Sequence, residues 1–219
     1  MDFSLYGFYN KKFIKDSGLA EIESKILPQF IRTDAENTTD GERMLEGKNV
    51  NLRIAEKEDL PLLQEWWNSL EFSGIYNPLD AQQSKADVEK QYERLGSEKQ
   101  WFLVLKKDGS KIGFLVMRTS VFGWQIGYVL IPSERGKGYC TEAVQLAVDY
   151  LFMSKDIVRV QAGTFTDNVA SQRVLEKAGF KREGRIRKGM LAWGNWVDLY
   201  VYSILREEWK EPKILTKTV

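Results

Sequence analysis

One short stretch of the sequence has residue types and spacing typical of an anion-binding site. In "IPSERGKGYCTEAV", residues 131–144, Gly136 and Gly138 flank Lys137 between an apolar run and the start of a predicted helix. Glycines let successive backbone N–H groups point at one centre, and the N-terminus of a helix adds partial positive charge. A tight turn with solvated basic side chains would contain the same residues, so other features of the chain are needed to distinguish the two.

Two familiar nucleotide-binding motifs do not fit this glycine turn. A P-loop requires Gly-x-x-x-x-Gly-Lys-Ser/Thr, but Ile131 stands five residues before Gly136, and a glycine follows Lys137. A dinucleotide-binding motif requires a third glycine where Thr141 stands, near the start of a βαβ unit, whereas four predicted strands precede this turn. The expected anion site is therefore of another kind.

Composition excludes several classes of chemistry. The chain has 219 residues, a formal net charge of +1, one cysteine and no histidine. Without histidine there is no Ser-His-Asp triad, no histidine general base and no His-ligated metal. The single Cys140 excludes an internal disulfide and a thiolate-cage zinc site. Because we find neither a signal-peptide core nor an 18-residue apolar stretch, we expect a soluble, cytoplasmic protein with no metal and no DNA or membrane partner.

Hydrophobic periodicity predicts one mixed α/β (α+β) domain over residues 48–219. Apolar alternation indicates strands, and apolar residues three or four apart indicate helices. Strands are predicted at 50–56, in a hairpin at 101–118, and at 124–131, 158–165, 181–190 and 195–209, with helices at 58–70, 83–96, 141–152 and 167–180. The hairpin turns at Asp108-Gly109, a dipeptide that favours such turns.

Residues 1–47 differ from this pattern, and we interpret them as an N-terminal extension. Leu19, Ile22 and Ile26 fall on one face of a predicted helix, and the residues that follow are polar and rich in turn formers. No motif in this segment indicates what it does.

Three motifs in order resemble the GNAT N-acetyltransferase superfamily. "VLIPSERGKGYCTEA" looks like its acetyl-CoA signature, Gln/Arg-x-x-Gly-x-Gly/Ala, with Ser133 at the first position in place of Gln or Arg. "DNVASQRVLEKAGFKREG" is similar to its second signature, Asn-x-x-Ser followed by Glu-Lys-x-Gly-Phe-x-x-Glu-Gly. The ending "WVDLYVYSILREEW" resembles the ribosomal-protein (RimJ/RimL-like) branch. The resemblance covers roughly residues 50–210 and implies a mixed, mostly antiparallel central sheet flanked by helices.

The resemblance also implies how acetyl-CoA, the co-substrate, is bound. The pyrophosphate would sit on backbone N–H groups of the glycine turn, and the end of the preceding strand would pair with the pantetheine arm. Gly127 is expected to allow a bulge that separates this strand from its neighbour. Asn168 would contact the arm or the substrate, although its position also suits a helix N-cap. The expected cofactor-binding residues are Val129, Leu130, Ile131, Arg135, Gly136, Lys137, Gly138, Tyr139, Cys140 and Asn168.

The reaction implied is direct attack of a primary amine on the thioester. Ser171 matches a family position proposed to protonate the departing thiolate, and a solvent-facing helix serine is the alternative. The general base is less defined. We place Asp198 first and keep Glu183 and Glu142 as candidates, although a structural ion pair or hydrogen bond is the favoured role for each of the three. A water relay, or uptake of the neutral fraction of the amine, would make a carboxylate base unnecessary. Direct attack needs no cysteine, so Cys140 is expected to pack.

The acceptor has several alternatives. The resemblance favours a protein or peptide N-terminal α-amine over a polyamine, an amino acid or an aminoglycoside. A protein that binds CoA without turnover is the alternative from another functional class. The expected partner is therefore the amine acceptor itself, and a homodimer is compatible with this interpretation.

Overall fold

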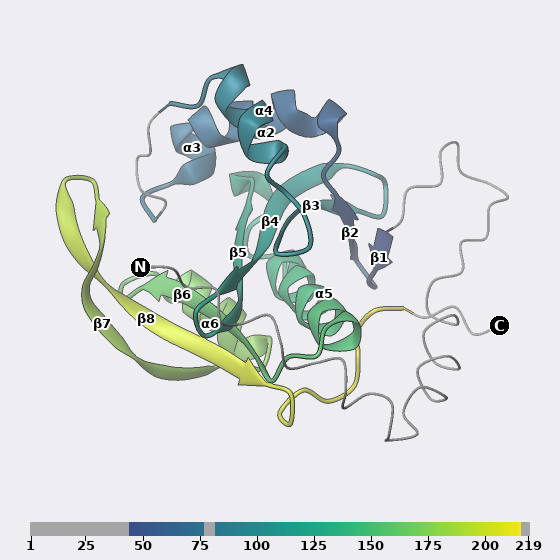
Figure 1. The fold of residues 1–219 in the computed structure, drawn as a ribbon, viewed down its shortest axis with the longest axis vertical. Helices are drawn as coiled ribbons and strands as arrows, with labels where there is room; N and C mark the ends of the chain where they lie inside the picture. The colour runs from purple at the N-terminus through teal and green to yellow at the C-terminus, as the bar shows by residue number, and fades with distance from the viewer. Residues whose placement is uncertain (1–43, 77–81, 216–219) are drawn as a thin grey trace, which may run out of the picture. The chain divides into compact units, whose positions relative to one another are not determined.

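A mixed sheet of eight strands forms the centre of the protein over residues 44–76 and 82–215, the ranges that the computed structural model describes (Figure 1). The strands lie in the order β1-β2-β3-β4-β5-β6-β8-β7. Their bounds are Met44–Glu46 (β1), Val50–Ile54 (β2), Lys99–Lys106 (β3), Lys111–Ser120 (β4), Gly123–Leu130 (β5), Arg159–Phe165 (β6), Lys181–Ala192 (β7) and Asn195–Leu205 (β8). The helices are α2 (Leu60–Asn68), α3 (Leu70–Ser73), α4 (Lys85–Tyr92), α5 (Tyr139–Ser154) and α6 (Val169–Lys177), with 3-10 turns η2 (Lys57–Asp59) and η3 (Pro132–Glu134).

The sheet splits between β5 and β6. These two strands are parallel and pair only through Trp124 with Val160 and Gln125 with Gln161. All other neighbouring strands are antiparallel, and β5 stays paired with β4 from Gly123 to Leu130. The edge of β5 that faces β6 therefore has no strand partner beyond Gln125 within the described residues, and an opening forms at that point.

Each face of the sheet carries its own hydrophobic core. Alternate residues of the strands pack against α5 and α6 on one face, where Leu115, Ile126 and Leu146 are almost fully buried. The residues between them face α2, α3 and α4, where Leu63, Trp101 and Leu103 are buried. This two-sided burial follows from the period of two in strands and explains the apolar runs in β3 and β4.

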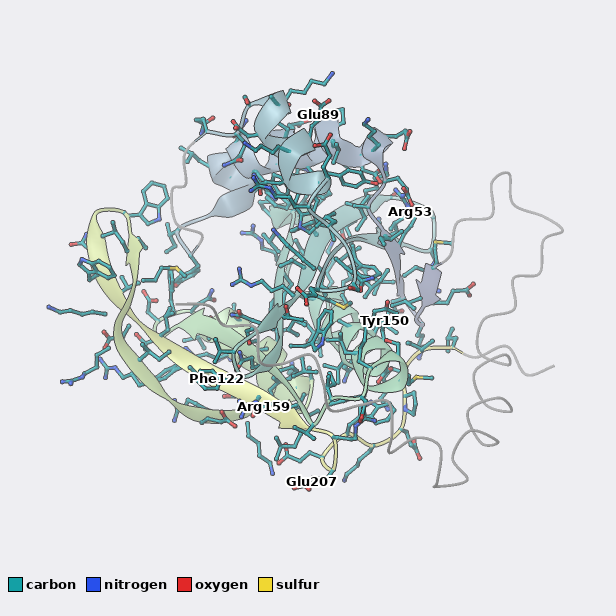
Figure 2. All side chains as sticks on the ribbon, viewed as in Figure 1. Arg53, Glu89, Phe122, Tyr150, Arg159 and Glu207 are labelled. Atoms are coloured by element: carbon teal, nitrogen blue, oxygen red, sulfur yellow. The ribbon has the colours of Figure 1, made fainter. Side chains whose placement is uncertain are left out.

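A buried ion pair fastens the first helices to the sheet. Arg53 on β2, labelled in Figure 2, donates to Asp59 at 2.9 Å, and Lys111 on β4 donates to the same carboxylate oxygen at 2.6 Å. The side chains of Arg53 and Asp59 are 5% and 2% exposed. Burial alone would raise the pKa of Asp59, but the hydrogen bonds from Arg53 and Lys111 outweigh it and hold the pKa below its usual range. The pair thus joins η2, β2 and β4.

The turn of the long β7–β8 hairpin extends toward the side of the sheet on which α3 lies (Figure 1). At its turn, Trp193 has a φ of 52°, and its indole N–H donates to the carbonyl of Ile75 at 3.0 Å. The residue after Ile75 makes a similar contact: the hydroxyl of Tyr76 donates to the carbonyl of Asp167 at 3.3 Å. These contacts connect the segment after α3 with β7–β8 and with the start of α6, so they span the two halves of the split sheet.

The predicted fold class is confirmed: the sheet is mixed, mostly antiparallel and flanked by helices. The helix predicted at 141–152 begins earlier, at Tyr139, and ends at Ser154. Two elements, β1 and α3, are too short for periodicity to reveal them. The helix predicted around Leu19 lies outside the described residues, and the domain boundary at residue 48 stays a prediction. Among the described residues, no helix is both long and apolar enough to span a bilayer.

Candidate active site

The glycine turn leads directly into α5. Gly136 and Gly138 have φ values of 78° and 88°, and Gly138 is the N-cap of the helix without any capping side chain. A Cβ atom built on either glycine would meet nothing within 4 Å. The two glycines are thus required by backbone conformation, and the space above them is open. Within the described residues, the backbone N–H groups of 136–140 donate to no acceptor, so they are available to an anion.

The basic residues of the turn have separate partners. Arg135 extends away from the glycines: its Nε donates to the carbonyl of Leu130 at 2.9 Å and its Nη2 to that of Phe72 at 2.8 Å. Its backbone N–H donates to Pro132, so the free donors begin at Gly136 rather than at Arg135. Lys137 pairs with Glu134 at 3.0 Å. Arg135 therefore fixes the end of β5 against α3 and supplies charge from beneath the turn.

The free edge of β5 presents backbone groups to the split. The N–H of Ile131 donates to Ile112 on the β4 side at 2.9 Å. Because strand N–H groups alternate between the two edges, those of Leu130 and Tyr128 point toward β6. Among the residues expected to bind the cofactor, Leu130 therefore offers its N–H to the split, as does Tyr128, whereas the N–H of Val129 points toward β4. The prediction of a bulge at Gly127 was wrong, because the β4–β5 register is regular at that residue. The opening arises instead where the pairing of β5 with β6 ends.

Two hydroxyl groups meet beside this edge. The phenol of Tyr128 lies 3.0 Å from the hydroxyl of Ser171 on α6 and 3.3 Å from its carbonyl oxygen. Burial raises the pKa of Tyr128 well above its usual value, so the phenol stays protonated. Burial also raises the pKa of Cys140 to about 12, which makes its thiol a poor nucleophile and fits the packing role. Ser171 and Tyr128 thus form a pair of neutral proton donors.

Asn168 holds Ser171 in place as the N-cap of α6. Its side-chain oxygen accepts the backbone N–H of Ser171 at 3.1 Å. The N-cap alternative is thereby observed, and the remaining amide group of Asn168 is half-buried beside the same opening.

The candidate general bases all have structural partners. Asp198 accepts the backbone N–H of Lys188 at 2.7 Å and an ion pair from Arg185, and these contacts lower its pKa. Ser203 and Arg159 lower the pKa of Glu183 in the same way. The carboxylate of Glu142 accepts both the backbone and side-chain N–H groups of Asn49 and fastens the turn before β2 to α5. This geometry favours the structural alternative for all three carboxylates.

Sequence reasoning missed Tyr128 and the bridge from Ile75 to Trp193. A tyrosine at the position of Tyr128 alternates with Ile126 and Leu130 and reads as core, so only the polar end of its ring signals another role. The bridge joins residues 118 positions apart, and no local pattern predicts it. Within residues 44–76 and 82–215, no group of three or more His, Cys, Asp or Glu side chains is placed to hold a metal ion.

Comparison with known proteins identifies the family. Residues 49–181 match the family described as acetyltransferase (GNAT) domain. A "Probable N-acetyltransferase YjcK" of Bacillus subtilis (strain 168) is 35% identical over 180 residues, which cover 75% of this chain and 98% of that protein. The chain belongs to the GNAT acetyltransferase family. It is an N-acetyltransferase.

Solved GNAT structures share this fold. The acetyltransferase (GNAT family) from Bacillus anthracis superposes with a TM-score of 0.65 at 26% identity, covering 75% of this chain and 99% of that one. A ribosomal-protein-S5-alanine acetyltransferase from Vibrio fischeri gives 0.66 at 22% identity over 78% and 100% of the two chains. A spermidine N-acetyltransferase from Vibrio cholerae, in complex with CoA and spermine, gives 0.65 at 19% identity over 73% and 97%. At these lower identities the last two likenesses concern the fold alone.

In this GNAT enzyme the open cradle at the glycine turn and the free edge of β5 are continuous along the chain. The turn offers unpaired N–H donors and open space, as a pyrophosphate requires. The edge offers alternate backbone groups that a chain with amides, such as a pantetheine arm, can match. The residues present therefore fit acetyl-CoA.

Proposed function

We propose that this enzyme transfers the acetyl group of acetyl-CoA directly to a protein or peptide N-terminal α-amine. The backbone N–H groups from Gly136 to Cys140 bind the pyrophosphate, and the edge of β5 from Ile126 to Ile131 orients the pantetheine arm. The N–H of Leu130 or Tyr128 polarises the thioester carbonyl. As the amine attacks, a C–N bond forms and the C–S bond breaks. Tyr128 or Ser171 protonates the leaving thiolate and takes back the proton that the attacking amine loses.

The state of the candidate bases supports an α-amine as acceptor. Asp198 and Glu183 have lowered pKa values, and Glu142 is occupied by Asn49, so none of the three is poised to remove a proton. The acceptor then has to enter as the neutral amine. An α-amine with a pKa near 8 is about one-tenth neutral at pH 7, whereas less than about one-thousandth of a lysine-type amine with a pKa near 10.4 is neutral.

The test is a thiol-release assay with acetyl-CoA and four acceptors at equal concentration: a peptide with a free N-terminus, the same peptide N-acetylated, spermidine, and an aminoglycoside. We expect release with the free peptide alone, and a rate that rises with pH to a plateau near the pKa of the α-amine, about 8. Faster transfer to spermidine or the aminoglycoside would contradict the proposed acceptor and support the small-molecule alternative. No release with any acceptor, together with no thermal shift by CoA, would contradict the proposed use of acetyl-CoA.

A further inference from the structure

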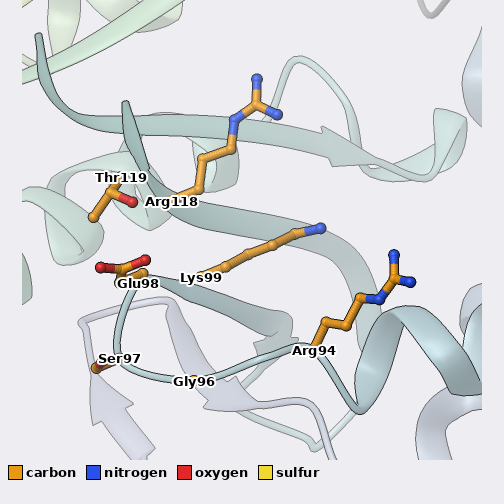
Figure 3. A pocket seen from close by; sticks show the side chains of 7 residues that line it. All are labelled: Arg94, Gly96, Ser97, Glu98, Lys99, Arg118 and Thr119. Atoms are coloured by element: carbon orange, nitrogen blue, oxygen red, sulfur yellow. The ribbon is translucent and has the colours of Figure 1, made fainter. Parts of the chain in front are cut away.

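A second pocket lies on the α2–α4 face of the sheet and is lined by cations. It has a volume of about 440 Å³ and is open to solvent. Figure 3 shows its lining residues, which come from the end of α4, the turn before β3, and the paired ends of β3 and β4. They are Arg94, Gly96, Ser97, Glu98, Lys99, Arg118 and Thr119. None of them belongs to β5, α5 or the glycine turn, so the pocket is separate from the cradle for the pyrophosphate.

The three cations of this pocket have no carboxylate partner within the described residues. Arg118 donates to the side-chain oxygen of Gln125 at 3.1 Å, and Lys99 stands 5.4 Å from the centre of the Trp101 ring. Arg94 forms none of the ion pairs found among the described side chains. In Figure 3 the side chains of Arg94 and Lys99 extend to the same side, while the carboxylate of Glu98 lies on the other. Like charges gathered without a counter-ion repel one another and favour a bound anion.

The protonation of Lys99 agrees with this geometry. Its pKa is lowered by burial and, in addition, by the charges of Arg118 and Arg94. An anion in the pocket would relieve both of these charge repulsions.

The pocket is in register with the split of the sheet. Lys99 pairs with Arg118 across β3 and β4, and Arg118 pairs with Gln125 across β4 and β5. Side chains of directly paired residues project from the same face, so these three form a row. Gln125 is also the last residue of β5 that pairs with β6. The row therefore runs over about 10 Å, two strand spacings, from the cations to the residue of β5 at which the split begins. The N–H groups of Tyr128 and Leu130 lie three and five residues farther along β5, which is about another 10–17 Å.

We propose that Arg94, Lys99 and Arg118 form a subsite for an anionic group of the acceptor, a carboxylate or a phosphate held about 15–20 Å from the reacting amine. This inference rests on the proposed function, because it takes the split as the place where the amine meets the thioester. Guanidinium groups bind both anions through paired N–H donors, and the positive row disfavours a polyamine. In an extended peptide about 15–20 Å corresponds to about five residues, so an acidic or phosphorylated fifth residue fits.

The experiment compares acceptors that differ in one charge. Three peptides share a sequence apart from residue 5, which is Glu, phosphoserine or Gln, and 12-aminododecanoate is compared with its amide. We expect kcat/KM for the charged member of each pair to exceed that of the neutral one about tenfold, mainly through KM. The ratio of the Glu peptide to the phosphoserine peptide identifies the preferred anion. In K99Q and R118Q the ratio of kcat/KM for the charged acceptor to that for the neutral one should fall toward one. The control is K90Q, which makes the same charge change on α4, four residues before Arg94, and should keep this ratio.

A binding measurement separates this proposal from the proposed function. The N-acetylated Glu and Gln peptides are titrated calorimetrically into the CoA complex, where no turnover is needed. Tighter binding of the Glu peptide, lost in the K99Q/R118Q double variant, supports the subsite even if peptides prove to be poor acceptors. Equal affinity for the two peptides, or a preference that persists in the double variant, overturns the subsite even if acetyl transfer to peptides is rapid.

Discussion

The hydroxyl groups of Tyr128 and Ser171 lie 3.0 Å apart although 43 residues separate them in the chain. The first is on the last strand before the split and the second is in the first turn of α6. Both are neutral donors, and the raised pKa of the phenol keeps it protonated over the whole pH range in which the enzyme can work. We therefore treat the two as one proton-donating unit.

Removing this unit should slow the chemical step more than it weakens binding. A general acid contributes typically 10²–10⁴-fold, but a thiolate leaves readily, so we expect Tyr128→Phe to lower kcat by about 10–100-fold. Ser171→Ala should cost less, because Tyr128 keeps its contact with the carbonyl of residue 171. The measurement is kcat together with the Kd of CoA for each single variant and for the double variant. Unchanged kcat in the double variant would remove both residues from the mechanism.

Gly136→Glu should abolish binding of CoA. The new carboxylate would enter the open space above the turn and repel the pyrophosphate, and the φ of 78° adds backbone strain. Gly136→Ala is the matched control, because it introduces the strain, about 1–2 kcal/mol, without the charge. Thermal shift with CoA distinguishes the two variants: none is expected for the glutamate variant and a reduced one for the alanine variant. An undiminished shift in Gly136→Glu would place the pyrophosphate elsewhere.

Asn168→Ala should affect both stability and turnover. Loss of an N-cap costs about 1 kcal/mol, which lowers Tm by about 2–4 °C in a domain of this size. Because Asn168 holds the backbone of Ser171, turnover should fall as well. Asn168→Asp keeps a capping oxygen and should restore Tm. If Tm is restored but turnover is not, the amide nitrogen of Asn168 contacts the substrates directly.

Asp198→Asn tests the residue first considered as general base. Its pKa is lowered from the ordinary value of 3.8 by the Lys188 N–H and by Arg185, so folding favours the carboxylate. Such a group adds stability above its unfolded pKa and loses it as pH falls through the lower folded pKa. The variant should therefore be less stable than the wild type at pH 7, and the difference should shrink as pH falls below 3.8 and vanish below the lowered folded pKa.

Measuring kcat shows whether Asp198 also acts as the general base. We expect Asp198→Asn and Arg185→Gln to lower Tm alike and to retain kcat within about threefold, since either one removes the same ion pair. A loss of kcat in the aspartate variant alone, with a changed pH profile, would restore Asp198 as the base.

Cys140 should take no covalent part in the reaction. With its pKa raised to about 12 by burial, the thiol stays protonated at neutral pH. Intact-mass measurements after mixing with acetyl-CoA should show no acetylated enzyme, and Cys140→Ala should keep kcat within about threefold. A stable acetyl adduct that is absent from the alanine variant would contradict direct transfer.

Local patterns in the sequence were sufficient to predict most of the strands and helices, but not every contact between them. Alternation in β3 and β4 and the glycines before α5 are local signals, and the strands and the turn appear where these signals predict them. The apolar stripe at 141–152 leaves out the first two residues of α5, because Gly138 is its N-cap through backbone conformation and no capping side chain marks the start.

The contacts that sequence reasoning missed depend on register. Ser171 was predicted from its motif, but its partner Tyr128 is defined only by how α6 packs on the sheet. The cations of the second pocket come from the turn after α4, from β3 and from β4, and the pairing of Lys99 with Arg118 places two of them side by side. Likewise, the partners of Asp198 are Arg185 and Lys188 on the adjacent strand β7, so the sequence alone could not distinguish a base from an ion pair.

The free edge of β5 has a consequence for the behaviour of the protein in solution. A strand edge with unpaired N–H and C=O groups accepts any extended backbone that can reach it, including one from another copy of the chain. When CoA lies along that edge, the same groups are occupied. Intermolecular strand addition, and the aggregation that follows from it, should therefore be most pronounced in ligand-free preparations, and CoA should protect the enzyme during purification and storage.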